Sequence, residues 1–122
     1  MKKKRILIVD DDPSVQDAFR FIFDENRYEV NIYPSGVDIL SDQYTVPDIF
    51  LLDKQLSGID GLDICRFLKN TEKTKHIPII ILSASPHIEE LAKKAGADDL
   101  LEKPFSIKEL RAKVEEHLQA QQ

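Results

Sequence analysis

Acidic residues of this chain follow two short apolar runs, and their chemistry would suit a hard cation. The range Asp10–Asp12 comes directly after Ile6–Val9, and Asp53 comes directly after Ile49–Leu52. Carboxylates that share one pocket repel each other, so that such a group either raises one pKa or holds a cation. Oxygen ligands alone, in small number, are what Mg²⁺ prefers. If the two runs are neighbours in the fold, Asp10, Asp11 and Asp53 converge on one candidate metal site.

A hydroxyl and an ammonium group stand at the ends of two further apolar runs. Ser83 follows Ile77–Leu82, and Lys103, which precedes Pro104, follows Leu100-Leu101. These two side chains can bind an incoming phosphoryl group, while the metal and the lysine neutralise the charge on its oxygens in the transition state. A carboxylate nucleophile, a divalent metal, a hydroxyl and an ammonium together predict a phosphoryl-acceptor site.

The apolar runs that precede these polar residues predict buried β-strands. Three runs are continuous rather than alternating, which is typical of strands that are covered on both faces. Pro78 interrupts the last of them near its entry, where a missing N–H is tolerated. The five predicted strands cover Arg5–Val9, Tyr28–Tyr33, Ile49–Leu52, Ile77–Leu82 and the surroundings of Leu100-Leu101.

Amphipathic segments with helical spacing lie between and after the predicted strands. Asp12 before Pro13 predicts the first helix start, and Gly96 predicts the end of the fourth helix. The resulting order, strand then helix five times, predicts a parallel α/β sheet with helices on both faces and ligands beyond the carboxyl ends of the strands. The apolar faces are Val15, Ala18, Phe19, Ile22 and Phe23; a shorter segment over Gly36–Asp42; Leu62, Ile64, Cys65, Phe67 and Leu68; Ile88, Leu91, Ala92 and Ala95; and Ile107, Leu110, Val114 and Leu118.

Length and composition fit one domain over residues 1–122, with 42% hydrophobic and 32% charged residues. The net charge of −5 disfavours a broad surface for nucleic acid or membrane. We expect a cytoplasmic protein, because no stretch approaches the ~20 apolar residues of a membrane span and no secretory signal begins the chain. The single cysteine, Cys65, precludes an internal disulfide and is expected in the core. The chain ends with the fifth helix, so no output domain is expected within it.

These segments together resemble the receiver domains of two-component response regulators over nearly the whole chain. The segments that carry the resemblance are Ile6–Asp11, Asp48–Gly61, Ile79–Ala84, and Ala95-Gly96-Ala97 leading to Lys103-Pro104-Phe105. The resemblance implies a doubly wound, flavodoxin-like (βα)5 fold with strand order 2-1-3-4-5.

The resemblance also implies a role for each polar residue. Asp53 would take a phosphoryl group from a sensor histidine kinase or a phosphotransfer protein and so change the binding of a downstream partner. Asp10, Asp11, Asp53 and the backbone carbonyl of Gln55 would hold Mg²⁺. Ser83 and Lys103 would bind the phosphoryl group, and the Lys103–Pro104 bond would be cis. Such a domain is a phosphoacceptor that assists its own phosphorylation and dephosphorylation rather than a conventional enzyme.

Three positions depart from the usual family pattern. Ser57, which lies outside the residues that the structure describes, stands four residues after the acceptor, where the family usually has proline. Leu100 stands where family members usually carry tyrosine or another aromatic residue, so the aromatic part of the family's switch is missing. Lys54 follows the acceptor, where an apolar residue is commoner, and would either add positive charge near the phosphoryl group or point to solvent.

Three other functions are compatible with parts of the pattern. A phosphatase of the haloacid-dehalogenase kind would use Asp10 as its nucleophile, but Asp98-Asp99 precedes Lys103 instead of following it. A docking module without phosphorylation commonly loses an acidic or lysine position, and this chain keeps them all. A flavodoxin-type flavin protein would need glycines and free N–H groups where Asp10–Asp12 stands.

Overall fold

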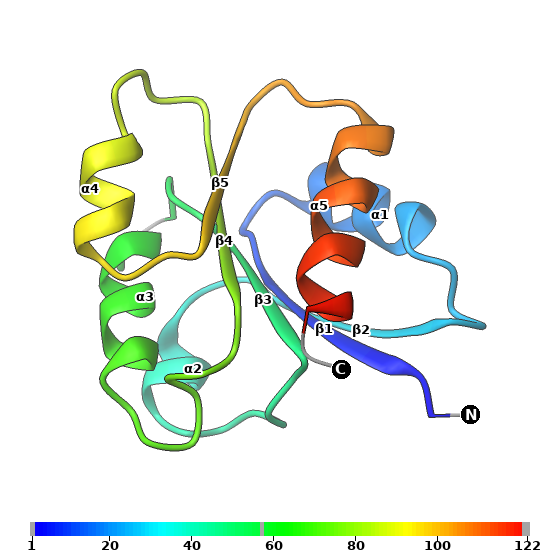
Figure 1. The fold of residues 1–122 in the computed structure, drawn as a ribbon, viewed down its shortest axis with the longest axis horizontal. Coiled ribbons are helices and arrows are strands. Elements are labelled where there is room, and N and C mark those ends of the chain that lie inside the picture. Colours follow the sequence, from blue (N-terminus) through cyan, green and yellow to red (C-terminus); the bar gives the residue numbers. More distant parts are fainter. Residues whose placement is uncertain (1, 57, 121–122) are drawn as a thin grey trace.

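The strands and helices alternate along the chain in the computed structural model, which describes residues 2–56 and 58–120. Figure 1 shows the ten elements in sequence colours. They are β1 (Lys4–Val9), α1 (Pro13–Ile22), β2 (Tyr28–Tyr33), α2 (Val37–Leu40), β3 (Ile49–Asp53), α3 (Gly61–Lys69), β4 (Ile79–Ser83), α4 (Glu89–Lys94), β5 (Asp99–Glu102) and α5 (Ile107–Gln119).

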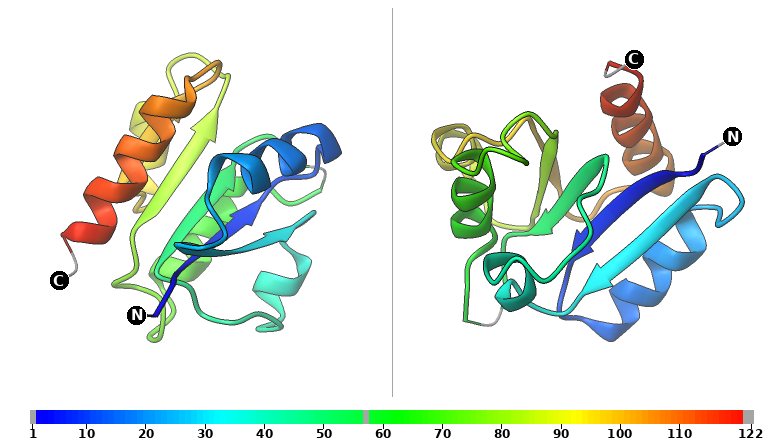
Figure 2. Two further views of the ribbon diagram at one scale, coloured as in Figure 1. Left: turned by 90° about the vertical axis from the view of Figure 1, so that its right-hand side faces the viewer. Right: turned by 90° about the horizontal axis from the view of Figure 1, so that it is seen from below.

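All five strands form one parallel sheet in the order β2-β1-β3-β4-β5, as predicted. Helices α1 and α5 cover one face, and α2, α3 and α4 cover the other (Figures 1 and 2). Alternate strand residues point to the two faces, so each face has its own core. Ile6, Ile8, Ile49 and Leu51 pack with Phe19, Leu110 and Val114, whereas Leu7, Phe50, Leu52 and Ile79 pack with Ile64, Cys65 and Leu68.

The ends of two strands differ from the sequence prediction in a way that matters for the site. Asp53 and Ser83 are the last residues of β3 and β4 rather than the residues after them. The sheet ladder extends this far because Lys54 N–H donates to the Leu82 carbonyl at 2.9 Å and Lys103 N–H donates to the Ser83 carbonyl at 2.8 Å. Both polar side chains are therefore anchored by a rigid sheet.

The structure confirms the predicted helix ends around α1 and α4. The Asp12 carboxylate accepts a hydrogen bond from Ser14 N–H at 2.9 Å, with Pro13 in the first turn. Gly96 follows α4 with a φ of 92°, a left-handed conformation that glycine adopts without a steric penalty.

The predicted apolar faces of α1, α3, α4 and α5 were partly wrong. Ala18 is exposed, and Phe67, Leu91 and Ile107 are 38%, 51% and 44% exposed. On α4, Ala92 and Ala95 are buried against the sheet, and Leu91 lies at the edge of this buried face. Ile107 belongs to the first turn of α5. A helix buries only the part of its stripe that lies over the sheet. Cys65 is fully buried, as predicted, and burial raises the pKa of its thiol to about 11.

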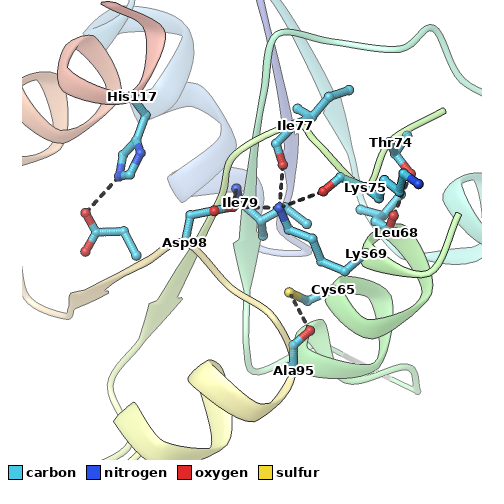
Figure 3. A network of polar contacts seen from close by, with 11 residues as sticks. Cys65, Leu68, Lys69, Thr74, Lys75, Ile77, Ile79, Ala95, Asp98 and His117 are labelled. Atoms are coloured by element: carbon cyan, nitrogen blue, oxygen red, sulfur yellow. Dashed lines mark hydrogen bonds and ion pairs between the residues drawn. The ribbon is translucent and has the colours of Figure 1, made fainter. Parts of the chain in front are cut away.

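A partly buried ammonium group joins three segments at the end of the sheet where β4 and β5 begin (Figure 3). The Lys69 ammonium donates to the Ile77 carbonyl at 2.8 Å and to the Lys75 carbonyl at 3.3 Å, and it lies 2.7 Å from the Asp98 carboxylate. Asp98 also accepts from Ile79 N–H at 2.8 Å. The aliphatic part of Lys69 lies against Gly96, where an added Cβ would come within 3.0 Å of its Cγ. One side chain thus connects α3, the start of β4 and the turn before β5.

We predict that Lys69→Met lowers the free energy of unfolding by about 1–3 kcal/mol, because it leaves two carbonyls and a carboxylate without their donor. Chemical denaturation checks this value. Lys75→Met is the matched control, since the Lys75 side chain is 54% exposed and its ammonium pairs with the exposed Glu72 carboxylate. We expect a loss below about 0.5 kcal/mol for the control. Equal stabilities of the two variants would contradict the structural role of Lys69.

Candidate functional site

Three carboxylates meet at the carboxyl ends of β1 and β3. These strands are parallel neighbours, with Val9 opposite Leu52, so the residues that follow them lie side by side. One oxygen from each of Asp10, Asp11 and Asp53 lies within 4.8 Å of the other two. The structure therefore brings together the three acidic residues that the sequence analysis selected.

The central carboxylate of this group is buried without full compensation. Asp10 is fully buried, and one of its oxygens accepts a hydrogen bond from Asp12 N–H at 2.9 Å. Its other oxygen, Oδ2, is buried and has no hydrogen-bond partner. Burial raises the pKa of Asp10 above its usual value, and the charges of Asp53 and Asp11 raise it further, against the opposing effects of the Asp12 N–H and Lys103. An oxygen of this kind, close to two other carboxylates, suits a hard divalent cation, so the residues present fit Mg²⁺.

The positive charge in the described part of this site comes from Lys103. Its ammonium lies 3.3 Å from Asp53 Oδ1 and 3.8 Å from Asp10 Oδ2. At 3.8 Å, the contact between Lys103 and Asp10 Oδ2 is an ion pair that is too long for a hydrogen bond. This agrees with the absence of a hydrogen-bond partner for that oxygen among the described residues. The Lys103–Pro104 bond is cis, as predicted. The lysine faces both carboxylates from the end of β5, on the far side of β4.

Ser83, at the end of β4, and Gln55, in the loop after β3, lie beside Asp53 in the sheet and along the chain. Ser83 is fully buried, and its hydroxyl accepts a hydrogen bond from Ser85 N–H at 3.0 Å. The Gln55 backbone N–H donates to Asp53 Oδ1 at 3.2 Å. The role of the Gln55 carbonyl as a metal ligand stays a prediction.

Gly61 lets α3 begin directly beneath the Asp53 backbone. A Cβ at this position would lie 2.2 Å from the Asp53 carbonyl oxygen and 2.9 Å from its carbonyl carbon. Both are backbone atoms of a buried strand, so neither can give way easily. Asp60 precedes Gly61 and caps the helix by accepting from Leu62 N–H at 2.8 Å.

The structure pairs Lys54 with an acidic residue, and its effect on the charge near the phosphoryl group stays a prediction. Its ammonium lies 2.9 Å from the Asp60 carboxylate, so it is held at the start of α3. An aspartate directly before an apolar helical pattern is a local sequence signal for the helix cap of Asp60. The ion pair of Asp60 with Lys54 depends on the conformation of the loop between them, which sequence spacing does not reveal.

A second group of charged residues, which the sequence analysis missed, lies on β5 and α5. The Asp99 carboxylate accepts from Lys113 at 3.1 Å and lies 2.9 Å from His117 Nε2. Burial alone would raise the pKa of Asp99, but hydrogen bonds from His117, Leu100 N–H and Lys113 outweigh it and lower that pKa. The spacing of Lys113 and His117 places them on one face of a helix. Their common partner, Asp99, is revealed only by the packing of α5 against β5.

Leu100 lies beside a cavity of about 330 Å³ between α4 and β5. It is half-buried and packs against the core on the α2, α3 and α4 face. Ala92 and Lys93 of α4 also line this cavity. The position without an aromatic ring, noted in the sequence, is thus next to open space.

Comparisons with known proteins agree with this geometry. The family model of the response regulator receiver domain matches residues 6–115. The response regulator MprA of Mycobacterium avium (strain 104) is 39% identical over 116 residues, which are 90% of this chain and 49% of that protein. The DNA-binding dual master transcriptional regulator RpaA of Synechocystis is 36% identical over 114 residues, 90% of this chain and 47% of that protein. The chain therefore spans about half the length of these relatives.

Solved structures show the same fold. A putative response regulator from Chloroflexus aurantiacus superposes with a TM-score of 0.87 at 36% identity, covering 96% of this chain and 98% of that one. The receiver domain of the sensor histidine kinase PA1611 from Pseudomonas aeruginosa, with a magnesium ion coordinated in its active-site cleft, gives a TM-score of 0.85 at 28% identity, with coverage of 96% and 98%. No helix in the described part of the present chain is long and apolar enough to span a membrane.

We predict that Asp53→Asn raises the free energy of unfolding without metal by about 0.5–2 kcal/mol, because it removes a charge next to the buried Asp10 carboxylate. The lost ion pair with Lys103 offsets only part of this gain, since the lysine side chain is 27% exposed. Urea denaturation in EDTA measures the difference. Asp63→Asn is the control, because Asp63 is 58% exposed on α3, and it should change little. A clear loss of stability in Asp53→Asn alone would refute the crowding.

Proposed function

This chain belongs to the response regulator receiver family and is a receiver domain of two-component signal transduction, and from that premise we propose that Asp53 is its phosphoryl acceptor. The observation that carries the proposal is the meeting of Asp10, Asp11 and Asp53 within 4.8 Å, with Lys103 at 3.3 Å from Asp53. Family membership alone identifies the fold and the kind of signalling. The choice of residue rests on this geometry.

Access favours Asp53 over Asp10 as the nucleophile. Both carboxylates accept a backbone N–H bond, but Asp10 is fully buried, whereas Asp53 keeps 5% of its surface exposed at the end of β3. An Asp53 oxygen would form a bond to phosphorus while the bond from phosphorus to the donor histidine nitrogen breaks. The leaving nitrogen then keeps the electron pair of that bond.

The residues that would hold Mg²⁺ are the carboxylates of Asp10, Asp11 and Asp53 and the backbone carbonyl of Gln55. The unsatisfied buried oxygen of Asp10 supports this assignment. When bound, Mg²⁺ supplies positive charge that balances the carboxylates and the phosphoryl oxygens.

Ser83 and Lys103 would bind the phosphoryl oxygens from the side of β4 and β5. The hydrogen bond from Ser85 N–H uses a lone pair of the Ser83 hydroxyl, so the hydroxyl proton can be donated to a phosphoryl oxygen. Lys103 would exchange its contact with Asp53 for the more negative phosphoryl group.

The partners follow from this chemistry. The phosphoryl donor would be a sensor histidine kinase or a phosphotransfer protein, and phosphorylation would change the binding of a downstream protein. The domain would assist both its own phosphorylation and its own dephosphorylation through Mg²⁺, Ser83 and Lys103. With a net charge of −5, we propose no direct contact of this domain with nucleic acid.

Intact-mass spectrometry after treatment with acetyl phosphate and Mg²⁺ tests the acceptor directly. We expect one added phosphoryl group on the wild type and none on Asp53→Asn. Addition to both proteins would indicate Asp10 as nucleophile and support the phosphatase alternative. No addition to either protein would support the docking module.

Thermal unfolding tests the metal site independently of phosphorylation. We predict that Mg²⁺ at 100 times its dissociation constant stabilises the native state by about 2.7 kcal/mol and raises the melting temperature accordingly. NaCl at equal ionic strength is the control for screening. Asp11→Asn should weaken the response to Mg²⁺. A melting temperature that millimolar Mg²⁺ leaves unchanged would contradict the metal assignment.

A further inference from the structure

A side-chain hydrogen bond links the two loops that flank Asp53. The Gln55 amide Nε2 donates to the Ser85 hydroxyl at 3.1 Å. Gln55 lies in the loop after β3, and Ser85 lies in the loop after β4. The bond therefore connects the loop that leaves the acceptor with the loop that leaves Ser83.

This bond belongs to a closed ring of polar contacts. Gln55 N–H donates to Asp53 Oδ1 at 3.2 Å, and Ser85 N–H donates to the Ser83 hydroxyl at 3.0 Å. Asp53 and Ser83 end adjacent strands, with Asp53 opposite Leu82, so the sheet completes the ring. The acceptor carboxylate and the buried hydroxyl are thus connected through Gln55 and Ser85 as well as through the sheet.

The contact is distinct from the others that shape the loop after β3. The ion pair of Lys54 with Asp60 and the bond from Gly61 N–H to the Lys54 carbonyl at 3.3 Å close the loop on itself and on α3. Leu56 and Ile59 pack on the core further along. The bond to Ser85 acts on Gln55, whose backbone N–H donates to the acceptor carboxylate.

We propose that Ser85 is a positioning residue for the metal site, which holds Gln55 and thereby raises the affinity of the domain for Mg²⁺. This inference rests on the proposed function, in which Gln55 supplies a backbone ligand. A loop that is fixed before the ion arrives loses less conformational freedom on binding, so the complex is tighter. Hydrogen bonds to the residues that hold a metal ion typically change the affinity for that ion by about 10- to 100-fold. Because Gln55 is exposed, we expect about two- to tenfold, the value of one solvent-facing hydrogen bond.

A double-mutant cycle read by calorimetric titration with Mg²⁺ tests the proposal. Ser85→Ala and Gln55→Ala should each raise the dissociation constant for Mg²⁺ by about two- to tenfold. The double variant should bind no more weakly than either single variant, because both remove the same bond. Ser85→Thr keeps the hydroxyl and should bind nearly as the wild type does. Gln43→Ala, which removes an exposed glutamine between α2 and β3, is the matched control. Metal-free melting temperatures of the wild type and of the five variants should all lie well above the temperature of the titration, so that every protein is folded when it is titrated.

The outcomes separate this inference from the proposed function. If the wild type binds Mg²⁺ and the single variants bind equally well, the positioning role is wrong while the metal site stands. Additive effects in the double variant would also overturn it, because they would show that the two residues act separately. If the wild type itself does not bind millimolar Mg²⁺, the proposed function fails and this inference fails with it.

Discussion

The site depends on one electrostatic constraint, the burial of the Asp10 carboxylate at the end of β1. A carboxylate without full compensation in a protein interior is costly, and one oxygen of Asp10 has no hydrogen-bond partner. The Asp12 N–H and the Lys103 ammonium reduce this cost, but Asp53 and Asp11 increase it. A divalent cation is the group that would relieve all three carboxylates at once. The fold therefore holds its acidic group in a state that favours binding of such an ion.

The parallel sheet is what makes this arrangement rigid. Asp53 and Ser83 end neighbouring strands, and Lys103 follows the next strand, so that the β3–β4 and β4–β5 ladders position the three groups. The close approach of α3 to the Asp53 backbone allows only glycine at position 61. At the opposite end of the sheet, Lys69 fixes the starts of β4 and β5 through carbonyls and Asp98 (Figure 3). Ser83 and Lys103 thus stand at the ends of two strands whose starts are held by Lys69.

The sequence was sufficient for the order of strands and helices and for the meeting of the acidic residues at the strand ends, because both follow from local patterns. The strand order 2-1-3-4-5 was implied by the family resemblance, and the roles of the site residues stay predictions. Continuous apolar runs identified buried strands, and polar residues at their ends identified the site. The pairs Lys54–Asp60 and Gln55–Ser85, and the group around Asp99, could not be predicted, because each depends on how loops close or on how α5 packs. The exposure of Leu91 was missed for a similar reason. Periodicity identifies the apolar residues on one face of a helix, but it does not show which of them the sheet covers.

The most direct test of this account is a carbon-13 NMR titration of the Asp10 side-chain carboxyl, with and without Mg²⁺. The account predicts a pKa above the ordinary aspartate value of 3.8 in the metal-free protein, because burial and two neighbouring carboxylates disfavour the charged form. Saturating Mg²⁺ should lower that pKa, because the cation stabilises the carboxylate. An ordinary or lowered pKa without metal, or one that Mg²⁺ leaves unchanged, would contradict the claim that the buried charge of Asp10 prepares the site for a cation.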